Sequence, residues 1–165
     1  MRDADSLRED MKDAAQKWEA EHGYITLRDY FQDKPHSAEQ TENADDLLKR
    51  VNALLSEYVS QGGVLSKDPD TGTYISGSKG GAGDGGFRIS TTVTGRPGSA
   101  HKEGMAVDVV DAGNKLDEWI TRDLLVKYDL YREAKQWTEN WTHLTTRPPR
   151  SLTRSYNPWA TGKTY

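Results

Sequence analysis

Apolar side chains recur at helical spacing in two long stretches near the start of the chain. Residues 4–21 set this apolar face against a strongly charged one, so the pattern predicts an amphipathic helix. We expect its apolar face to pack on the core of the domain, although a separable, charged segment would also suit docking to a partner. Residues 43–61 predict a second helix with a broader apolar face, ended by two glycines. The apolar positions of the first helix are Leu7, Met11, Ala14, Ala15 and Trp18.

Two short segments lie between and beside these helices. Residues 26–31 predict a short helical element, because Thr26 can cap it and Asp29 occupies the capping-box position. Residues 33–42 are polar and predict a loop, in which His36 faces solvent. The first third of the chain therefore predicts helices joined by loops.

The rest of the chain predicts short strands around one late helix, which favours an α+β fold with a small antiparallel sheet and flanking helices. We expect one domain over 24–158, an N-terminal helical extension over 1–23 and a C-terminal tail over 159–165. The glycine-rich loop 77–86 contains a GxGxxG match, but it lacks the strand–turn–helix setting of a dinucleotide site. The expected elements are strands over 86–93, 105–111, 129–133 and 141–146 and a helix capped by Asn114 that runs to Tyr128.

Composition excludes several classes of protein. The formal net charge of −4 gives no footprint for general nucleic-acid binding, and no apolar run approaches the roughly 20 residues of a membrane span. Cysteine is absent, so disulfides and thiolate metal sites are excluded. The charged N-terminus lacks the apolar centre of a secretory signal, so we expect a protein made in the cytoplasm that would need another route to act outside it.

The stretch GSAHKEGMAVDV, residues 98–109, contains a histidine and an aspartate that are separated by six residues. Two imidazoles and one carboxylate are a common ligand set for catalytic zinc, with a fourth position left for water. His101 and Asp108 would be two such ligands, with His143 as the third. A capped turn that leads into a strand would also explain the pair. An aspartate within an apolar strand nevertheless needs a partner, because an unpaired buried charge is costly.

Three blocks of the sequence resemble one family of zinc peptidases. SAHKEGMAVD fits the family's SxHxxGxAxD motif, GGFRIS is similar to its SGFRS-type segment, and NWTHL is similar to its WxH segment. The order and spacing of the blocks also agree. The family contains the D-alanyl-D-alanine carboxypeptidases and dipeptidases and the phage L-alanyl-D-glutamate endolysins, and its fold is shared with Hedgehog. The similarity covers residues 25–158, resembles phage-encoded members in particular and leaves residues 1–22 uncovered.

The resemblance implies a Hedgehog-like zinc peptidase fold whose site is built from the three blocks. His101, Asp108 and His143 would hold Zn²⁺, and Arg88 would grip a substrate carboxylate or stabilise the oxyanion. Gly104 would permit a tight turn where a side chain would crowd the metal or the substrate. The substrate class implied is the stem peptide of bacterial peptidoglycan. The substrate-binding residues implied are Ser99, Arg88 and Trp141.

The chain departs from the family at the general base. The family has Glu or Asp three residues before its last histidine, where this chain has Asn140, whose amide cannot take up the proton. Glu139 lies one residue further back and Glu103 lies inside the first motif, and we take Glu139 as the provisional base. On a regular strand Glu139 would share the face of His143 and Asn140 would not.

Two functions follow from these expectations. The first is a zinc metallopeptidase that hydrolyses peptidoglycan stem peptides at the bacterial cell wall, as a bacteriophage endolysin after release or as a virion-associated wall hydrolase. The second is a structural protein of a phage virion or tail on the same fold, with a structural or vestigial zinc site. The N-terminal helix would then serve assembly with the virion or with a second copy. Whether the carboxylate of Glu139 reaches the metal discriminates between the two.

Overall fold

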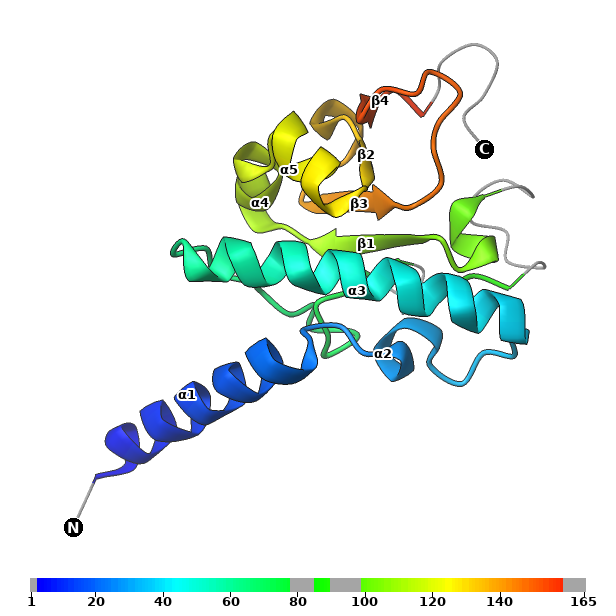
Figure 1. The fold of residues 1–165 in the computed structure, drawn as a ribbon. Helices are drawn as coiled ribbons and strands as arrows, with labels where there is room; N and C mark the ends of the chain where they lie inside the picture. The colour runs from blue at the N-terminus through cyan, green and yellow to red at the C-terminus, as the bar shows by residue number, and fades with distance from the viewer. Residues whose placement is uncertain (1–2, 78–84, 90–98, 159–165) are drawn as a thin grey trace.

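The computed structural model describes residues 3–77, 85–89 and 99–158, and the tail over 159–165 lies outside these ranges (Figure 1). Within these ranges three α-helices come first along the chain, and the four strands follow with two further α-helices between β1 and β2, so the α+β class is confirmed. The first helices are α1 (Ala4–His22), α2 (Leu27–Phe31) and α3 (Ala38–Ser60). The later elements are the 3₁₀ helix η1 (Ala100–Glu103), β1 (Ala106–Val110), η2 (Ala112–Asn114), α4 (Lys115–Trp119), α5 (Arg122–Tyr128), β2 (Tyr131–Glu133), η3 (Lys135–Trp137), β3 (Trp141–Thr145) and β4 (Ser155–Tyr156).

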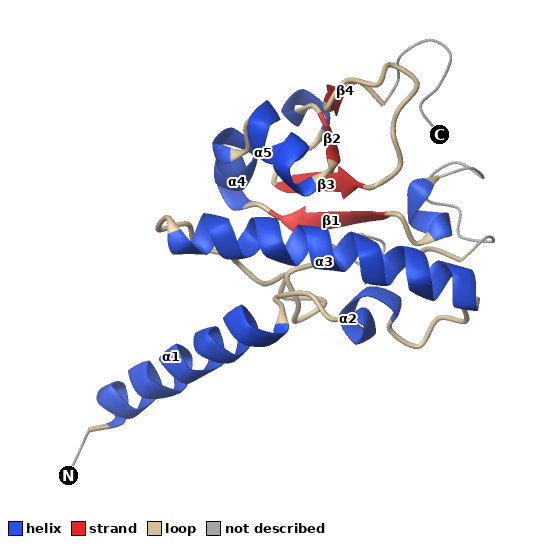
Figure 2. Ribbon diagram, in the orientation of Figure 1, coloured by secondary structure: helices blue, strands red, loops and turns tan. Residues whose placement is uncertain are grey.

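The sheet contains four strands in the order β1-β3-β2-β4 (Figure 2). β3 pairs antiparallel with both β1 and β2, whereas β2 and β4 run parallel. The strands expected near β1, β2 and β3 are confirmed, but the purely antiparallel sheet is wrong. The chain returns after β3 to the free edge of β2 and enters it in the same direction, with Ser155 beside Arg132. The result is a mixed sheet.

The core lies between α3 and one face of the sheet. Val107 and Val109 of β1 and Leu144 of β3 are fully buried in it. Because successive side chains on a strand point to opposite faces, Asp108 and His143 are directed to the other face. The buried residues that α3 contributes are Ala44, Leu47, Leu48, Val51, Leu54, Leu55 and Tyr58.

Helix α3 begins five residues earlier than its apolar pattern predicts. The hydroxyl of Ser37 accepts the backbone N–H of Gln40 at 3.1 Å, and the side-chain oxygen of Gln40 accepts the N–H of Ser37 at 2.8 Å. This capping box starts the helix inside the segment 33–42, so the loop expected there is wrong in its second half. The cap expected at Thr26 is confirmed, with Asp29 as its reciprocal partner.

The single helix expected after Asn114 is two helices. Asn114 has a φ of 57° and makes no side-chain cap; the carboxylate of Asp111 instead accepts two backbone N–H groups of α4 at 2.7 and 2.9 Å. The chain becomes extended at Ile120, and Thr121 then caps α5. Two local capping groups therefore override one continuous apolar pattern.

Helix α1 projects away from the rest of the molecule (Figure 1). Leu7, Met11 and Trp18 are 50%, 73% and 53% exposed, so the expectation that this face packs on the core is wrong. The last turn is attached to the body, because the hydroxyl of Tyr74 donates to the carboxylate of Glu19 at 2.6 Å. No helix in the described ranges is long and apolar enough to cross a membrane.

The segment before η1 lies along the outer edge of β1. The strand expected over 86–93 is wrong in its described part, residues 86–89, and its remainder lies outside the described ranges. The N–H of Asp108 donates to the carbonyl of Gly85 at 2.7 Å. A Cβ at Gly85 would overlap the carbonyl oxygen of Ser76, so glycine is required for this close approach. The same segment places Arg88 beside Asp108, with 3.6 Å between Nη2 of Arg88 and Oδ2 of Asp108.

Candidate metal centre

Two strands bring the first pair of candidate ligands together. Asp108 of β1 and His143 of β3 are direct partners in the antiparallel register. Their side chains share the face of the sheet that is turned away from the core, and Nδ1 of His143 lies 2.8 Å from Oδ1 of Asp108. The register of the β1–β3 pair therefore joins residues that are far apart in the sequence.

The third candidate ligand comes from η1. The hydroxyl of Ser99 accepts the N–H of His101 at 3.4 Å where this short helix begins. Nδ1 of His101 lies 2.9 Å from the carbonyl oxygen of Gly86 and must carry the proton to donate to it. This contact leaves Nε2 as the lone-pair nitrogen, which lies 3.4 Å from Oδ1 of Asp108.

Helix α3 holds η1 in place. Gly104 ends η1 with a φ of 77°, and a Cβ there would lie 2.7 Å from the carbonyl oxygen of Gln40. The tight turn expected at Gly104 is confirmed, but the group that a side chain would crowd is the start of α3. The Gln40 amide donates to a carbonyl of η1 at 3.1 Å, and the amide of Asn43 donates to the carbonyl of Glu103 at 2.9 Å. The first turns of α3 thus position the segment that contains the candidate ligand His101.

The three candidate ligands form a compact, buried group that could hold a metal ion. One ligand atom from each residue lies within 4.8 Å of the others. His101, Asp108 and His143 are 2%, 9% and 4% exposed. A tetrahedral zinc ion at about 2.0–2.1 Å from its ligands would separate them by about 3.3 Å. The two nitrogen–oxygen separations around Asp108, 3.4 and 2.8 Å, lie near this value.

Asp108 is ionised in this setting. Burial by itself raises the pKa of a carboxyl group, but attraction and hydrogen bonding from His101 and His143 hold the pKa of Asp108 well below its ordinary range. Arg88 adds positive charge, because its guanidinium Nη2 lies 3.6 Å from Oδ2 of Asp108. The backbone N–H of Arg88 also donates to the carbonyl of His101 at 3.2 Å, so the arginine is part of the same cluster.

The two histidines are in different electrostatic environments. Burial lowers the pKa of His101, against the attraction of Asp108. Burial also acts to lower the pKa of His143, but the negative charges of Glu133 and Asp108 outweigh it, so the pKa is raised. A proton would therefore compete with a metal ion at His143 up to a higher pH than at His101.

Glu133 of β2 is a residue of this centre that the sequence patterns missed. Its Oε1 lies 3.8 Å from Nε2 of His143, and its side chain is 15% exposed. The β2–β3 pairing of Arg132 with Leu144 makes Glu133 and His143 the next neighbours in the register. Because both residues belong to strands that were expected, antiparallel alternation was the signal that could have found the contact.

The residues around the start of β3 lie outside the metal group. Glu139 is exposed. Asn140 has a φ of 68°, and its side-chain oxygen accepts the N–H of Gly113 at 3.1 Å. Trp141 is half-buried on the same strand face as His143. The roles expected of Glu139 as base and of Trp141 in substrate binding stay predictions.

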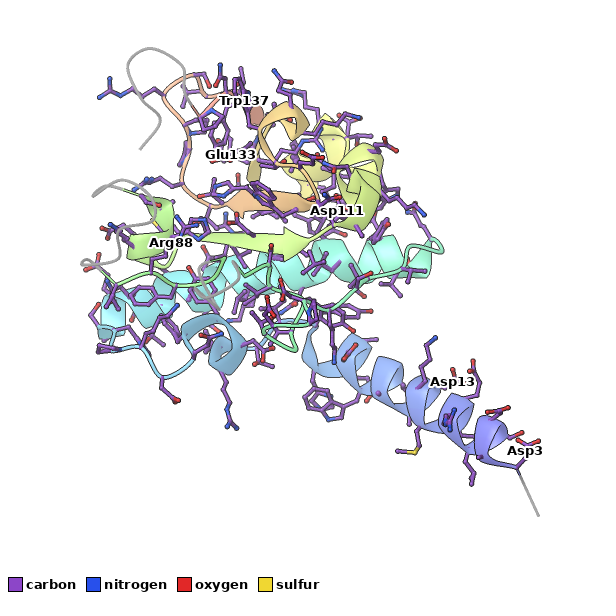
Figure 3. The ribbon with its side chains drawn as sticks, turned by 180° about the vertical axis from the view of Figure 1, so that it is seen from behind. Asp3, Asp13, Arg88, Asp111, Glu133 and Trp137 are labelled. Carbon is purple, nitrogen blue, oxygen red and sulfur yellow. The ribbon has the colours of Figure 1, made fainter. Side chains whose placement is uncertain are left out.

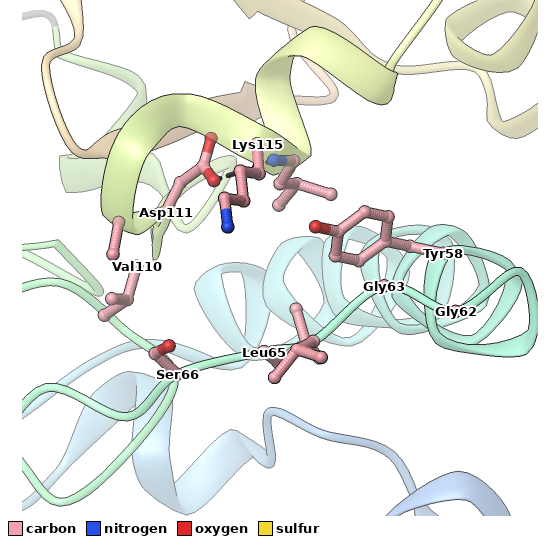
Figure 4. A pocket seen from close by; sticks show the side chains of 11 residues that line it. Tyr58, Gly62, Gly63, Leu65, Ser66, Val110, Asp111 and Lys115 are labelled. Carbon is pink, nitrogen blue, oxygen red and sulfur yellow. Dashed lines mark hydrogen bonds between the residues drawn. The ribbon is translucent and has the colours of Figure 1, made fainter.

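A separate cavity of about 300 Å³ lies between the end of α3 and the turn that leads into α4 (Figure 4). The carboxylate of Asp111 lies at its edge and is turned toward the backbone of α4. The described residues that line the cavity include none of the three candidate ligands. The metal group and this cavity are therefore distinct features of the molecule.

Comparisons of the chain with family models, with curated proteins and with solved structures found no match. The peptidase family suggested by the three sequence blocks therefore stays a prediction. The candidate metal centre is supported by the chain's own geometry, in which His101, Asp108 and His143 meet in one buried cluster.

Proposed function

We propose that the chain is a zinc-dependent peptidase that hydrolyses peptide bonds in the stem peptides of bacterial peptidoglycan. The observation that carries this proposal is the buried group of His101, Asp108 and His143, a donor set that suits a catalytic metal. The sequence blocks that resemble zinc peptidases contain all three residues. When bound, the ion would polarise a carbonyl oxygen and would acidify a water molecule toward neutral pH.

Arg88 supplies the positive charge that such a reaction needs beside the ligands. Its side chain is 11% exposed and its Nη2 lies 3.6 Å from Oδ2 of Asp108. A guanidinium in this position suits a substrate carboxylate or the negative charge that develops on a peptide carbonyl. Ser99 and Trp141 are the further substrate contacts of the proposal; Ser99 also accepts the N–H of His101.

The proposed place of action is the bacterial cell wall. The likeness of the blocks to phage-encoded members favours an endolysin made in the host cytoplasm and released to the wall, or a wall hydrolase carried by the virion. The substrate partner in either case is the peptidoglycan stem peptide.

Release of free amino groups from purified peptidoglycan tests the proposal. The zinc-loaded protein is expected to release them, a chelator is expected to stop release, and added zinc is expected to restore it. His101→Ala and Arg88→Ala should lower release, whereas Arg150→Ala, at an exposed arginine that is not a member of the cluster, should not. If zinc is bound and walls of every stem-peptide type yield no amino groups, the peptidase proposal is wrong.

A structural role in a phage virion or tail is the second candidate, and the position of Glu139 favours it. The resemblance places the base at Asn140, so Glu139 is the provisional substitute, yet its side chain is exposed at the turn before β3. A structural metal would use the same three ligands and would need no base. Replacing Glu139 by Gln should lower amino-group release by about 10²–10⁴ if this carboxylate is the base. Bound metal with no release from the wild-type protein would favour the structural role.

A further inference from the structure

Two carboxylates and the imidazole between them lie in one row across the sheet. Strand β3 lies between β1 and β2, so Asp108, His143 and Glu133 follow one another over three neighbouring strands. Arg132, the residue before Glu133, turns to the opposite face and pairs with Asp117. The carboxylate of Glu133 therefore shares the face of the two ligands.

His143 presents its two ring nitrogens to two different carboxylates. Nδ1 lies 2.8 Å from Oδ1 of Asp108, a hydrogen-bond distance. Nε2 lies 3.8 Å from Oε1 of Glu133, which is an ion-pair distance longer than a hydrogen bond. Each ring nitrogen directs its lone pair or its hydrogen outward in the plane of the ring, and the two nitrogens face different sides. A metal ion held with Asp108 must therefore be reached through Nδ1, which leaves the hydrogen on Nε2, the nitrogen on the side of Glu133.

We propose that Glu133 is a positioning residue: when a metal binds, its carboxylate closes from the 3.8 Å ion-pair distance to accept the Nε2 hydrogen of His143 and so keeps Nδ1 turned toward the metal. A carboxylate on the far nitrogen of a metal-ligating histidine fixes its tautomer and ring orientation and raises its basicity as a ligand. Glu133 acts through His143 and does not touch the reacting atoms. The inference rests on the proposed metal site and adds a residue outside the three motif blocks.

The experiment is a zinc affinity measurement by chelator competition on the full chain. Glu133→Ala should weaken zinc binding about 10- to 100-fold, the usual effect of removing such a partner. Glu133→Gln should recover part of the loss, because its amide oxygen still accepts a hydrogen bond. Glu118→Ala removes an exposed glutamate on α4 and should leave the affinity unchanged. Thermal unfolding of each metal-free variant checks that it is folded.

A second readout follows the histidine itself. In the zinc-loaded protein, ¹⁵N spectra of the imidazoles should show His143 bound through Nδ1 and protonated at Nε2. In Glu133→Gln this Nε2 proton should remain visible, and in Glu133→Ala it should exchange faster with water. A purely structural role of Glu133 would change neither signal. Coordination through Nε2 would overturn the proposal even if the alanine variant failed to fold.

The possible failures can be told apart. If wild-type protein binds no zinc, the metal site and the role of Glu133 are both wrong. If it binds zinc and folded Glu133→Ala binds it equally well, the role of Glu133 alone is wrong. If zinc binds, Glu133→Ala weakens it and peptidoglycan is not cleaved, the peptidase proposal is wrong and the positioning role stands.

Discussion

Two buried aspartates, Asp108 and Asp111, lie three residues apart at β1 and are paired in different ways. Figure 3 marks Asp111 near the end of the strand. Asp111 follows the end of the strand and accepts two backbone N–H groups of α4, at 2.7 and 2.9 Å. It also accepts the hydroxyl of Thr142 at 2.9 Å. Asp111 therefore joins β1, α4 and β3 through donors that the fold itself fixes.

Asp108 lies in the middle of the same strand. Its carboxylate is paired with side chains, whereas that of Asp111 is paired mainly with backbone N–H groups. His101 and His143 lie 3.4 and 2.8 Å from its Oδ1, and Arg88 lies 3.6 Å from its Oδ2. These partners come from three separate segments of the chain. Two of them are imidazoles, which can offer a lone pair to an ion.

The difference shows how a structural carboxylate can be distinguished from a candidate metal ligand. Backbone donors around Asp111 cannot turn to another partner unless the turn before α4 unfolds. The imidazoles around Asp108 are held by their own second contacts and converge on one small volume. Burial alone does not distinguish the two residues, because both are less than a tenth exposed.

Replacing Asp108 by Ala should give the largest effect, on metal content. Zinc should fall from about one ion per chain to nearly none after dialysis, because the charged ligand is lost. The metal-free protein should remain folded, since the side chain of Asp108 holds no backbone group. Elemental analysis and urea unfolding measure the two quantities. Zinc retained at one ion per chain would show that the site lies elsewhere.

Replacing Asp111 by Ala should do the reverse. Three donors would lose their acceptor, and each one left unpaired in the interior costs about 1–3 kcal/mol, so the free energy of unfolding should fall by about 3 kcal/mol or more. The folded fraction should still bind metal, because the ligand cluster is untouched. Asp123→Ala, at an exposed position in α5, should change stability by less than about 0.5 kcal/mol. If the Asp111→Ala protein were stable but had lost its metal, the structural role of Asp111 would be wrong.

Acid should weaken metal binding through His143. Its pKa is raised above the ordinary 6.5, so the proton competes with the ion up to a higher pH than at an exposed histidine. His101 has a lowered pKa and Asp108 stays ionised, so neither adds a proton. The zinc affinity should fall about tenfold per pH unit below the pKa of His143, as one proton is taken up. A chelator titration between pH 5.5 and 8 measures this slope, and a flat profile would contradict it.

The cluster of His101, Asp108 and His143 could be predicted from the sequence, whereas the place of Glu133 beside it could not be predicted from a motif. His101 and Asp108 lie in one short pattern whose local geometry, a 3₁₀ turn and a strand, is set by nearby residues. The contact of Glu133 with His143 depends on strand register instead. Strand register depends on packing across the whole sheet, so a short sequence motif does not determine it.

The helices show the same division between local and tertiary information. The apolar spacing of α1 predicts a helix with two faces, but it does not say what covers the apolar face, which is exposed. The early start of α3 and the break after α4 had local signals, the pair Ser37 and Gln40 and the cap Thr121. These capping residues were hidden within longer polar or apolar patterns.

The smallest expected effect concerns Asn140, where the chain departs from the zinc peptidase pattern. Asn140 adopts a φ of 68°, a left-handed conformation that asparagine tolerates better than glutamate. Asn140→Ala should lower the free energy of unfolding by about 1 kcal/mol, whereas Asn140→Gly should restore the backbone freedom and recover part of it. Neither variant should change zinc affinity, because this end of the β1–β3 pair holds the turn beside Gly113 and lies outside the ligand cluster. Urea unfolding measures the free energy of unfolding, and chelator titration measures the zinc affinity. If Asn140→Ala lost zinc affinity at unchanged stability, the metal centre would include the end of the β1–β3 pair where Asp111 and Asn140 lie.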